Sequence, residues 1–299
     1  MNHPTQAPTP ARSGPGAVRS AQYDAFHTAR ARSTLVGRLY AEAMGEEYPA
    51  EVAASSSCDW PLLGLMTARL RLRPGELLVD AACGAGGVGL WLARALAVHL
   101  DGFDLSSVAI AQATARRDHF LGGTDRAVFR VAELQNTGLP DACAHGIVCV
   151  DALGRAADRG AALRELGRVL APGGRLVVTR ALRRGAQPAW HEHVAAAGLV
   201  QDYVDERPGE PAMWARLYRL WTAHADQLRR ELGEAPAEAM LREAQQVLPT
   251  LPGRRAVVLT LRRPAATPDA PAGRSVADRM PGPARQSGDR PESSEETQQ

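Results

Sequence analysis

Short apolar runs alternate with stretches of helical spacing through the middle of the chain. Runs of about four to eight apolar residues between turns are typical of buried strands, and apolar positions three and four apart are typical of helices. The predicted strands are 76–81, 99–103, 127–131, 146–150, 175–179, 199–204 and 256–261. The predicted helices are 87–97, 106–119, 159–170, 211–232 and 236–247. Strands and helices alternating at this spacing predict an α/β fold, a parallel sheet with helices on both faces.

The two ends of the chain differ in composition from its middle. Residues 1–22 contain four prolines and almost no large apolar side chain, and residues 264–299 are also poor in such groups. Ordering a backbone costs roughly 1–2 kcal/mol per residue, which these segments cannot offset by burial. We therefore expect disordered tails at 1–22 and 264–299 around one folded domain of residues 23–263.

Composition and charge exclude several classes of protein. Of the 299 residues, 45% are hydrophobic and 23% are charged, which is a globular balance. The formal net charge of +2 gives no reason to expect nucleic acid or an anionic membrane as a partner. The four cysteines have no C-x-x-C spacing, which argues against a disulfide scaffold or a zinc ribbon. No bilayer-spanning run or secretory signal is visible, so we expect a cytoplasmic protein.

A glycine-rich loop follows the first predicted strand. Gly84, Gly86 and Gly89 form the pattern G-x-G-x-x-G. Glycines let the backbone approach a ligand closely, and the helix that follows directs its free N–H groups at an anion. Tight strand-to-helix turns use glycine in any case, so this pattern alone does not identify a ligand.

Four carboxylates lie at or just after the ends of the first four predicted strands, at Asp80, Asp104, Glu133 and Asp151. Ligands of open parallel sheets bind beyond the carboxyl ends of the strands, so these acids are expected to share one crevice. Asp104 stands about 20 residues after the glycines, where a carboxylate accepts from both ribose hydroxyls. Asp80 would repel a pyrophosphate, but it suits a ligand with an ammonium group and a positive centre. Glu133 stands where it could accept from an adenine amino group.

With these residues, positions 77–181 resemble the class I S-adenosylmethionine-dependent methyltransferases. The run V-D-A-A-C-G-A-G at 79–86 is similar to the first-strand motif V/L-D-x-G-C-G-x-G, with Ala82 in place of the first glycine. Asp104 is similar to the second-strand acid, and Glu133 stands where the family usually has Asp. The turn L-P-D-A at 139–142 and the run L-A-P-G-G-R-L at 170–176 are also similar to family signatures. His145 departs from the family, which commonly has Asp there.

The resemblance implies a Rossmann-like, seven-stranded, mostly parallel sheet with an antiparallel last strand and a helical cap. It divides the domain into an N-terminal helical cap (23–75), a cofactor-binding core (76–181) and a substrate-side cap with the last strands (182–263). The implied cofactor is S-adenosyl-L-methionine, and its methionine carboxylate would meet the helix N-terminus after the glycines. The residues expected to bind the cofactor are Asp80, Ala82, Gly84, Gly86, Asp104, Leu105, Glu133, Leu134 and Asp151.

The implied activity is methyl transfer to an oxygen, nitrogen or carbon atom of a small molecule, of the kind found in specialised metabolism. Such a transfer depends mainly on alignment, although oxygen and carbon nucleophiles usually need a base as well. His191 and His193, on a helix predicted to begin near residue 189, are the candidate bases; Tyr218 and Asp151 are alternatives. No second acidic cluster follows the strand 175–179, so no metal is expected.

Two other classes stay open at this point. An NAD(P)-dependent oxidoreductase would use the glycine pattern and Asp104, but Asp80 and Glu133 argue against it. The other is a methyltransferase-like protein that binds the cofactor without turnover, or that acts on a protein or peptide. The partner expected is a small-molecule substrate, with neither nucleic acid nor a membrane, and the oligomeric state is not predicted.

Overall fold

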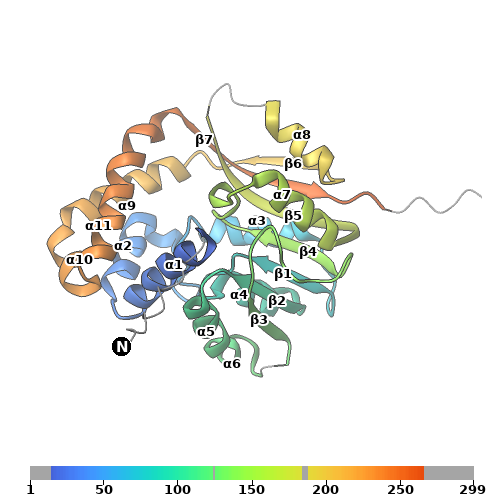
Figure 1. Ribbon diagram of the computed structural model, residues 1–299, viewed down its shortest axis with the longest axis horizontal. Helices are drawn as coiled ribbons and strands as arrows, with labels where there is room; N and C mark the ends of the chain where they lie inside the picture. The colour runs from blue at the N-terminus through green and yellow to red at the C-terminus, as the bar shows by residue number, and fades with distance from the viewer. Residues whose placement is uncertain (1–14, 124, 184–187, 266–299) are drawn as a thin grey trace, which may run out of the picture. The chain divides into compact units, whose positions relative to one another are not determined.

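Seven strands form one sheet in the order β3-β2-β1-β4-β5-β7-β6 (Figure 1). The computed structural model describes residues 15–123, 125–183 and 188–265. The strands are β1 (Leu77–Ala81), β2 (His99–Asp104), β3 (Ala127–Val131), β4 (Ala144–Cys149), β5 (Leu170–Arg183), β6 (Val200–Glu206) and β7 (Arg254–Arg262). Strands β1 to β5 pair in parallel, and β7 runs antiparallel to both β5 and β6. The predicted fold class is confirmed, including the antiparallel last strand.

Helices cover both faces of this sheet and extend beyond its carboxyl edge. They are α1 (Pro15–Ala31), α2 (Leu35–Met44), α3 (Trp60–Leu70), α4 (Gly87–Leu96), α5 (Ser107–Ala115), α6 (Arg117–Leu121), α7 (Arg159–Val169), α8 (Pro188–Ala196), α9 (Glu210–Ala223), α10 (Ala225–Leu232) and α11 (Glu234–Val247). Short 3₁₀ turns lie at Gly45–Glu47, Leu153–Arg155 and Leu248–Gly253. Side chains cap three of the helices: Asp59 accepts from Leu62 N–H, Ser106 from Ala109 N–H and Asp158 from Ala161 N–H.

Alternate residues of the strands enter separate cores on the two faces of the sheet. Val79 and Ile147 pack in one core with residues of α7 and α8. Leu78 and Val148, their neighbours along the strands, pack in the other core with residues of α3 and α4. Successive strand side chains point to opposite faces, so burial on both faces produces the continuous apolar runs seen in the sequence.

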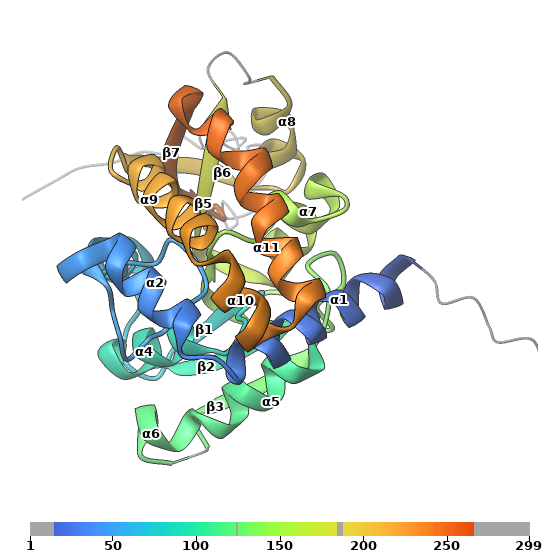
Figure 2. The same cartoon turned by 90° about the vertical axis from the view of Figure 1, so that its left-hand side faces the viewer.

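A third core joins helices from the two ends of the domain. Its buried residues come from α1, α2, α9, α10 and α11, which we call the helical cap. Figure 2 shows α9 and α10 beside α2, α11 packed against α9 and α10, and α1 passing along α5. Within the segment predicted as an N-terminal cap, 23–75, α1 and α2 contribute to this third core, whereas α3 packs against α4 and the sheet.

Two predicted boundaries differ from the structure. The helix predicted at 211–232 is divided at His224, which leaves helical geometry while its ring nitrogen bonds the Leu220 carbonyl. The segment predicted as a tail, 1–22, overlaps α1 from residue 15, and the Ser20 hydroxyl donates to the Leu105 carbonyl. The remaining parts of the predicted tails, 1–14 and 266–299, lie outside the described residues. Within the described ranges, no helix has both the length and the apolar character needed to cross a membrane.

Candidate active site

A large cavity lies at the carboxyl ends of β1, β2 and β4, beneath the helical cap. Its volume is about 1780 Å³, larger than the upper end of roughly 1,000 Å³ for pockets that hold one small ligand. Its walls are the loops after the strands, one face of α1, the segment 50–56, and residues of α9 and α11. The cavity therefore has room for a cofactor and a second molecule.

The glycine loop has a left-handed backbone conformation at several positions. Gly84 and Gly86 have φ of +53° and +75°, and Ala82 has φ of +60° although it is not glycine. A Cβ on Gly87 would lie 2.0 Å from the Val52 carbonyl oxygen, so only glycine lets the segment 50–56 close over the start of α4. The alanine in place of the family's first glycine is thus accommodated at a left-handed position, a kind of strain found at functional sites.

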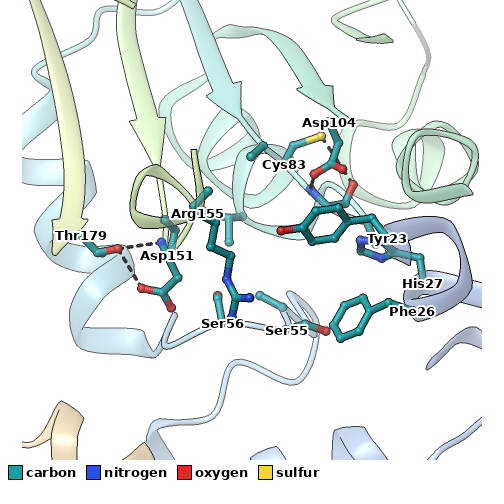
Figure 3. Close-up of a pocket in the computed structure, with 18 of the residues that line it drawn as sticks. Tyr23, Phe26, His27, Ser55, Ser56, Cys83, Asp104, Asp151, Arg155 and Thr179 are labelled. Carbon is teal, nitrogen blue, oxygen red and sulfur yellow. Dashed lines mark hydrogen bonds between the residues drawn. The ribbon is translucent and has the colours of Figure 1, made fainter. Parts of the chain in front are cut away.

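Asp104 lies at the end of β2 with its carboxylate in the cavity wall. One oxygen accepts from the Gly84 N–H and the other from the Ser106 N–H, both at 2.9 Å. Figure 3 shows this carboxylate above the glycine loop, with Tyr23 of α1 in front of it. A carboxylate oxygen has two lone pairs, so each oxygen can accept a further hydrogen bond from a ligand hydroxyl.

Helix α1 is tied to the loop after β2. The Asp24 carboxylate accepts from the Ser106 hydroxyl at 2.6 Å and from the Val108 N–H at 3.2 Å. His27, one turn further along, faces the glycine loop, because a Cβ on Gly84 would lie 3.5 Å from the His27 ring. Helix α1 thus closes the cavity above Asp104.

Asp80 is buried at the end of β1, where its carboxylate accepts from the Gly89 N–H at 2.9 Å. Burial raises the pKa of Asp80 to about 7, and the negative charge of Asp104 adds to the rise. A positively charged ligand beside this carboxyl would favour its ionised form.

Asp151, at the end of β4, holds three segments together. Its carboxylate accepts from the Thr179 hydroxyl at 2.8 Å and from the Ser57 N–H at 2.6 Å (Figure 3). Its backbone has φ of +53°, another strained position in the cavity wall. Asp151 lies where the sequence placed it, and these contacts also give it a structural role.

The remaining residues that were predicted to bind the cofactor line the cavity, with one exception. Glu133 is exposed at the rim, with Leu134 beside it, and Leu105 follows Asp104 in the wall. Gly86 is the exception, because it does not line the cavity. A Cβ there would lie 2.8 Å from the Ala113 side chain, so this glycine serves helix packing.

The structure does not bring the predicted bases to the cavity. His191 is exposed on α8, and His193 is half-buried against Gly160 of α7. Neither lines the cavity, because α8 packs on α7 and β6 at the far side of the sheet's last strands. The prediction that one of them is a base therefore has no support from the geometry.

The cap supplies a titratable group that the sequence analysis did not identify. One Glu210 oxygen accepts from the Trp214 indole N–H at 2.6 Å, and the other is buried without a partner among the described residues. Burial raises the pKa of Glu210 to about 7, and the nearby charge of Asp151 adds to the rise. Glu210 and Trp214 both line the cavity, near Asp151, whose charge acts on Glu210.

Aromatic and acidic side chains surround this end of the cavity. The Tyr218 hydroxyl donates to Glu243 at 3.1 Å, and Trp214 stacks on the Tyr218 ring at 5.5 Å between centroids. The aromatic side chains of α9 thus contribute both to the third core and to the cavity wall. Across the described ranges, no group of three or more His, Cys, Asp or Glu side chains could hold a metal ion.

These raised pKa values predict how stability depends on pH. Asp80 and Glu210 titrate near 7 in the folded protein, against ordinary values of 3.8 and 4.5. Between these values the folded protein binds more protons than the unfolded chain, so stability falls as the pH rises from about 4 to 7. On going from roughly pH 5 to pH 8, Asp80→Asn and Glu210→Gln should each gain melting temperature relative to wild type in scanning calorimetry. A difference from wild type that is independent of pH would contradict this assignment.

Comparisons with known proteins agree with this geometry. Residues 78–174 match the family model described as a methyltransferase domain. The chain is 30% identical to the 27-O-demethylrifamycin SV methyltransferase of Amycolatopsis mediterranei, over 57% of this chain and 58% of that protein. It is 30% identical to the methyltransferase GfsG of Streptomyces halstedii, over 39% of this chain and 42% of the relative. The chain therefore spans about half the length of these curated relatives.

Solved structures share the fold at lower sequence identity. The [4+2]-cyclase SpnF superposes with a TM-score of 0.65 and 22% identity, covering 84% of this chain and 96% of the other. A putative sarcosine dimethylglycine methyltransferase from Galdieria sulphuraria gives a TM-score of 0.59 at 16% identity, covering 69% of this chain and 85% of the other.

Residues 78–174 therefore match a methyltransferase domain, and the fold is shared with solved methyltransferase structures. The residues present fit S-adenosyl-L-methionine, the cofactor that the resemblance implies. The Asp104 carboxylate keeps free acceptor capacity for hydroxyls, and Asp80 supplies a buried acid suited to a positive ligand. The Gly84 backbone faces the cavity without a side chain.

Proposed function

We propose that the protein transfers a methyl group from S-adenosyl-L-methionine to a small-molecule acceptor. The observation that carries the proposal is the single cavity with two chemically different ends. One end has the glycine loop and Asp104, and the other has the aromatic and acidic side chains of α9 and α11. The similarity to the 27-O-demethylrifamycin SV methyltransferase supports a small-molecule acceptor of the kind found in specialised metabolism.

The cofactor, when bound, supplies a methyl group on a positively charged sulfur. The protein's own residues then have three tasks. Asp104 and the glycine loop orient the nucleoside end, and α1 with the segment 50–56 excludes water from the cavity. Trp214 and Tyr218 offer flat apolar surfaces against which an acceptor can be aligned, which is the main requirement of such a transfer.

Glu210 is the group best placed to take a proton from the acceptor. Its unpartnered oxygen is buried in the cavity wall, and its pKa of about 7 is suited to accepting a proton near neutral pH. The Trp214 indole N–H holds the other oxygen, which orients the carboxyl. We therefore propose Glu210, in place of His191 or His193, as the general base.

Product analysis tests this function. The full chain is incubated with S-adenosyl-L-methionine and with 27-O-demethylrifamycin SV, simple phenols and aliphatic amines as acceptors. We expect S-adenosylhomocysteine to form only with one acceptor class, together with a product one methyl group heavier. With that acceptor, Glu210→Gln should lower the single-turnover rate by roughly tenfold or more while cofactor affinity holds.

The contrary outcome would favour the other class considered from the sequence. If S-adenosylhomocysteine binds tightly and no acceptor is methylated, the protein uses the cofactor without turnover. The likeness of the fold to a [4+2]-cyclase makes a cycloaddition inside the same cavity the reaction to examine in that case.

A further inference from the structure

Arg30, in the last turn of α1, is a buried cation in the cavity wall. All three of its guanidinium nitrogens are buried without a hydrogen-bond partner, and no ion pair joins it to a carboxylate in the described part of the chain. A guanidinium carries five N–H donors, and burying it unpaired is costly. This group is therefore incomplete in the protein alone.

Aromatic rings hold the guanidinium in place without satisfying those donors. It lies 4.4 Å from the centroid of the Phe26 ring and 5.3 Å from that of Tyr40. Such contacts attract the cation through the ring faces, while the N–H groups at the edge stay available. The rings thus hold the guanidinium beside the cavity while its N–H donors stay without a partner.

The position of Arg30 on α1 directs it toward the cavity. Tyr23, His27 and Arg30 are separated by four and three residues, so they lie on one face of the helix. Figure 3 shows Tyr23 and His27 extending from that face toward Asp104 and Cys83. All three side chains line the cavity, and Arg30 lies one helical turn after His27, whose ring faces Gly84.

The segment 50–56 approaches the glycine loop in the same region. Arg116 links the two, because its guanidinium donates to the carbonyls of Ala85 and Val52 at 3.0 Å each. The charges of Arg30 and Arg116 both act on the Tyr48 hydroxyl, which lowers a pKa that burial raises. Arg116 is already occupied by carbonyls, so Arg30 is the cation of this pair that is left for a ligand.

We propose that Arg30 is the anion-binding group of the cavity and that its guanidinium pairs with a carboxylate, or a similar anion, of a bound ligand. The planar fork matches a carboxylate in two-point hydrogen bonding. Two ligands could supply the anion: the methionine end of the cofactor, which rests on the proposed function, or an acidic group of the acceptor. In either case α1 closes over the ligand with Arg30 as the counter-ion.

Two nucleoside ligands test the first source. S-adenosylhomocysteine carries the amino-acid carboxylate, and 5′-methylthioadenosine has the same nucleoside and thioether without it. In calorimetric titrations, Arg30→Met should weaken S-adenosylhomocysteine roughly tenfold or more and leave 5′-methylthioadenosine within about twofold of wild type. Arg32→Met is the matched control on the same stretch of chain, with an exposed side chain, and should change neither affinity. Arg30→Lys, which keeps the charge and loses the fork, should give an intermediate loss.

Titration of benzoate or inorganic phosphate into protein saturated with S-adenosylhomocysteine tests the second source. If the acceptor supplies the anion, wild type binds the probe and Arg30→Met does not. If neither titration distinguishes Arg30→Met from wild type, the proposal is overturned and Arg30 only packs on its two rings. If wild type fails to bind S-adenosylhomocysteine, the proposed function fails, and the probe titration on free protein still decides the role of Arg30. Should Arg30→Met not fold, Arg30→Lys is judged by the same criteria.

Discussion

Replacing Asp104 with alanine is expected to weaken S-adenosylhomocysteine binding by about 2 kcal/mol or more, which is roughly 30-fold. The carboxylate is only 9% exposed and accepts one backbone N–H on each oxygen, so it has capacity for two ligand hydroxyls. Hydrogen bonds from hydroxyls to a charged acceptor in a shielded site are stronger than neutral ones. Its loss also frees the N–H groups of Gly84 and Ser106, which shape the loop.

Asp101 provides the control for this experiment. It is a buried aspartate in the same strand, but it pairs with Arg130 and does not line the cavity. Asp101→Ala should therefore lower the melting temperature and leave the affinity unchanged. Equal losses of affinity in the two variants would show that damage to β2, and not a lost ligand contact, explains the effect of Asp104→Ala.

Replacing Arg207 with methionine is expected to lower the free energy of unfolding by about 3 kcal/mol. Arg207 is 9% exposed, pairs with Asp59 at 2.6 Å and donates to the Ser57 carbonyl at 2.8 Å. Asp59 is the N-cap residue of α3, and the Ser57 N–H donates to Asp151 in the cavity wall. The Arg207 guanidinium therefore links the N-terminus of a core helix to the cavity wall. Removing it leaves Asp59, 15% exposed, without its counter-ion, and uncompensated buried charge is strongly destabilising.

An exposed pair gives the matched comparison. Arg255 pairs with Glu206, and their side chains are 45% and 50% exposed. Arg255→Met should cost less than about 1 kcal/mol in the same denaturant titration, because solvent screens such pairs. A loss for Arg207→Met as small as that for Arg255→Met would contradict the role assigned to the buried network.

The centre of the sheet could be predicted because its strands are buried on both faces. That burial produces apolar runs such as the one predicted at 76–81, where β1 is observed at Leu77–Ala81 and is buried after its first residue. The start of α1 at Pro15 could not be predicted in the same way, because its ordering depends on α5 and the cap helices. The break between α9 and α10 at His224 could not be predicted either. It coincides with a hydrogen bond between the His224 ring and the Leu220 carbonyl, which the spacing of apolar residues does not reveal.

The acids of the site could be predicted because topology places them. Parallel strands end at one edge, so Asp80, Asp104 and Asp151 had to meet there. Glu210 and Arg30 come from helices far apart in the sequence, and only the packing of the third core brings both to the cavity. His191 was expected at the cavity because it follows β5 closely in the sequence. That position does not determine which side of the sheet α8 covers.

We infer that the cavity beneath α1 binds S-adenosyl-L-methionine and that Asp104 is the main carboxylate that holds it. Parallel titration calorimetry of the full chain with S-adenosylhomocysteine and with NADH tests it most directly. We expect one molecule of S-adenosylhomocysteine per chain, no binding of NADH, and binding that is weaker by roughly 30-fold or more in Asp104→Ala. Binding of NADH without binding of S-adenosylhomocysteine would contradict it.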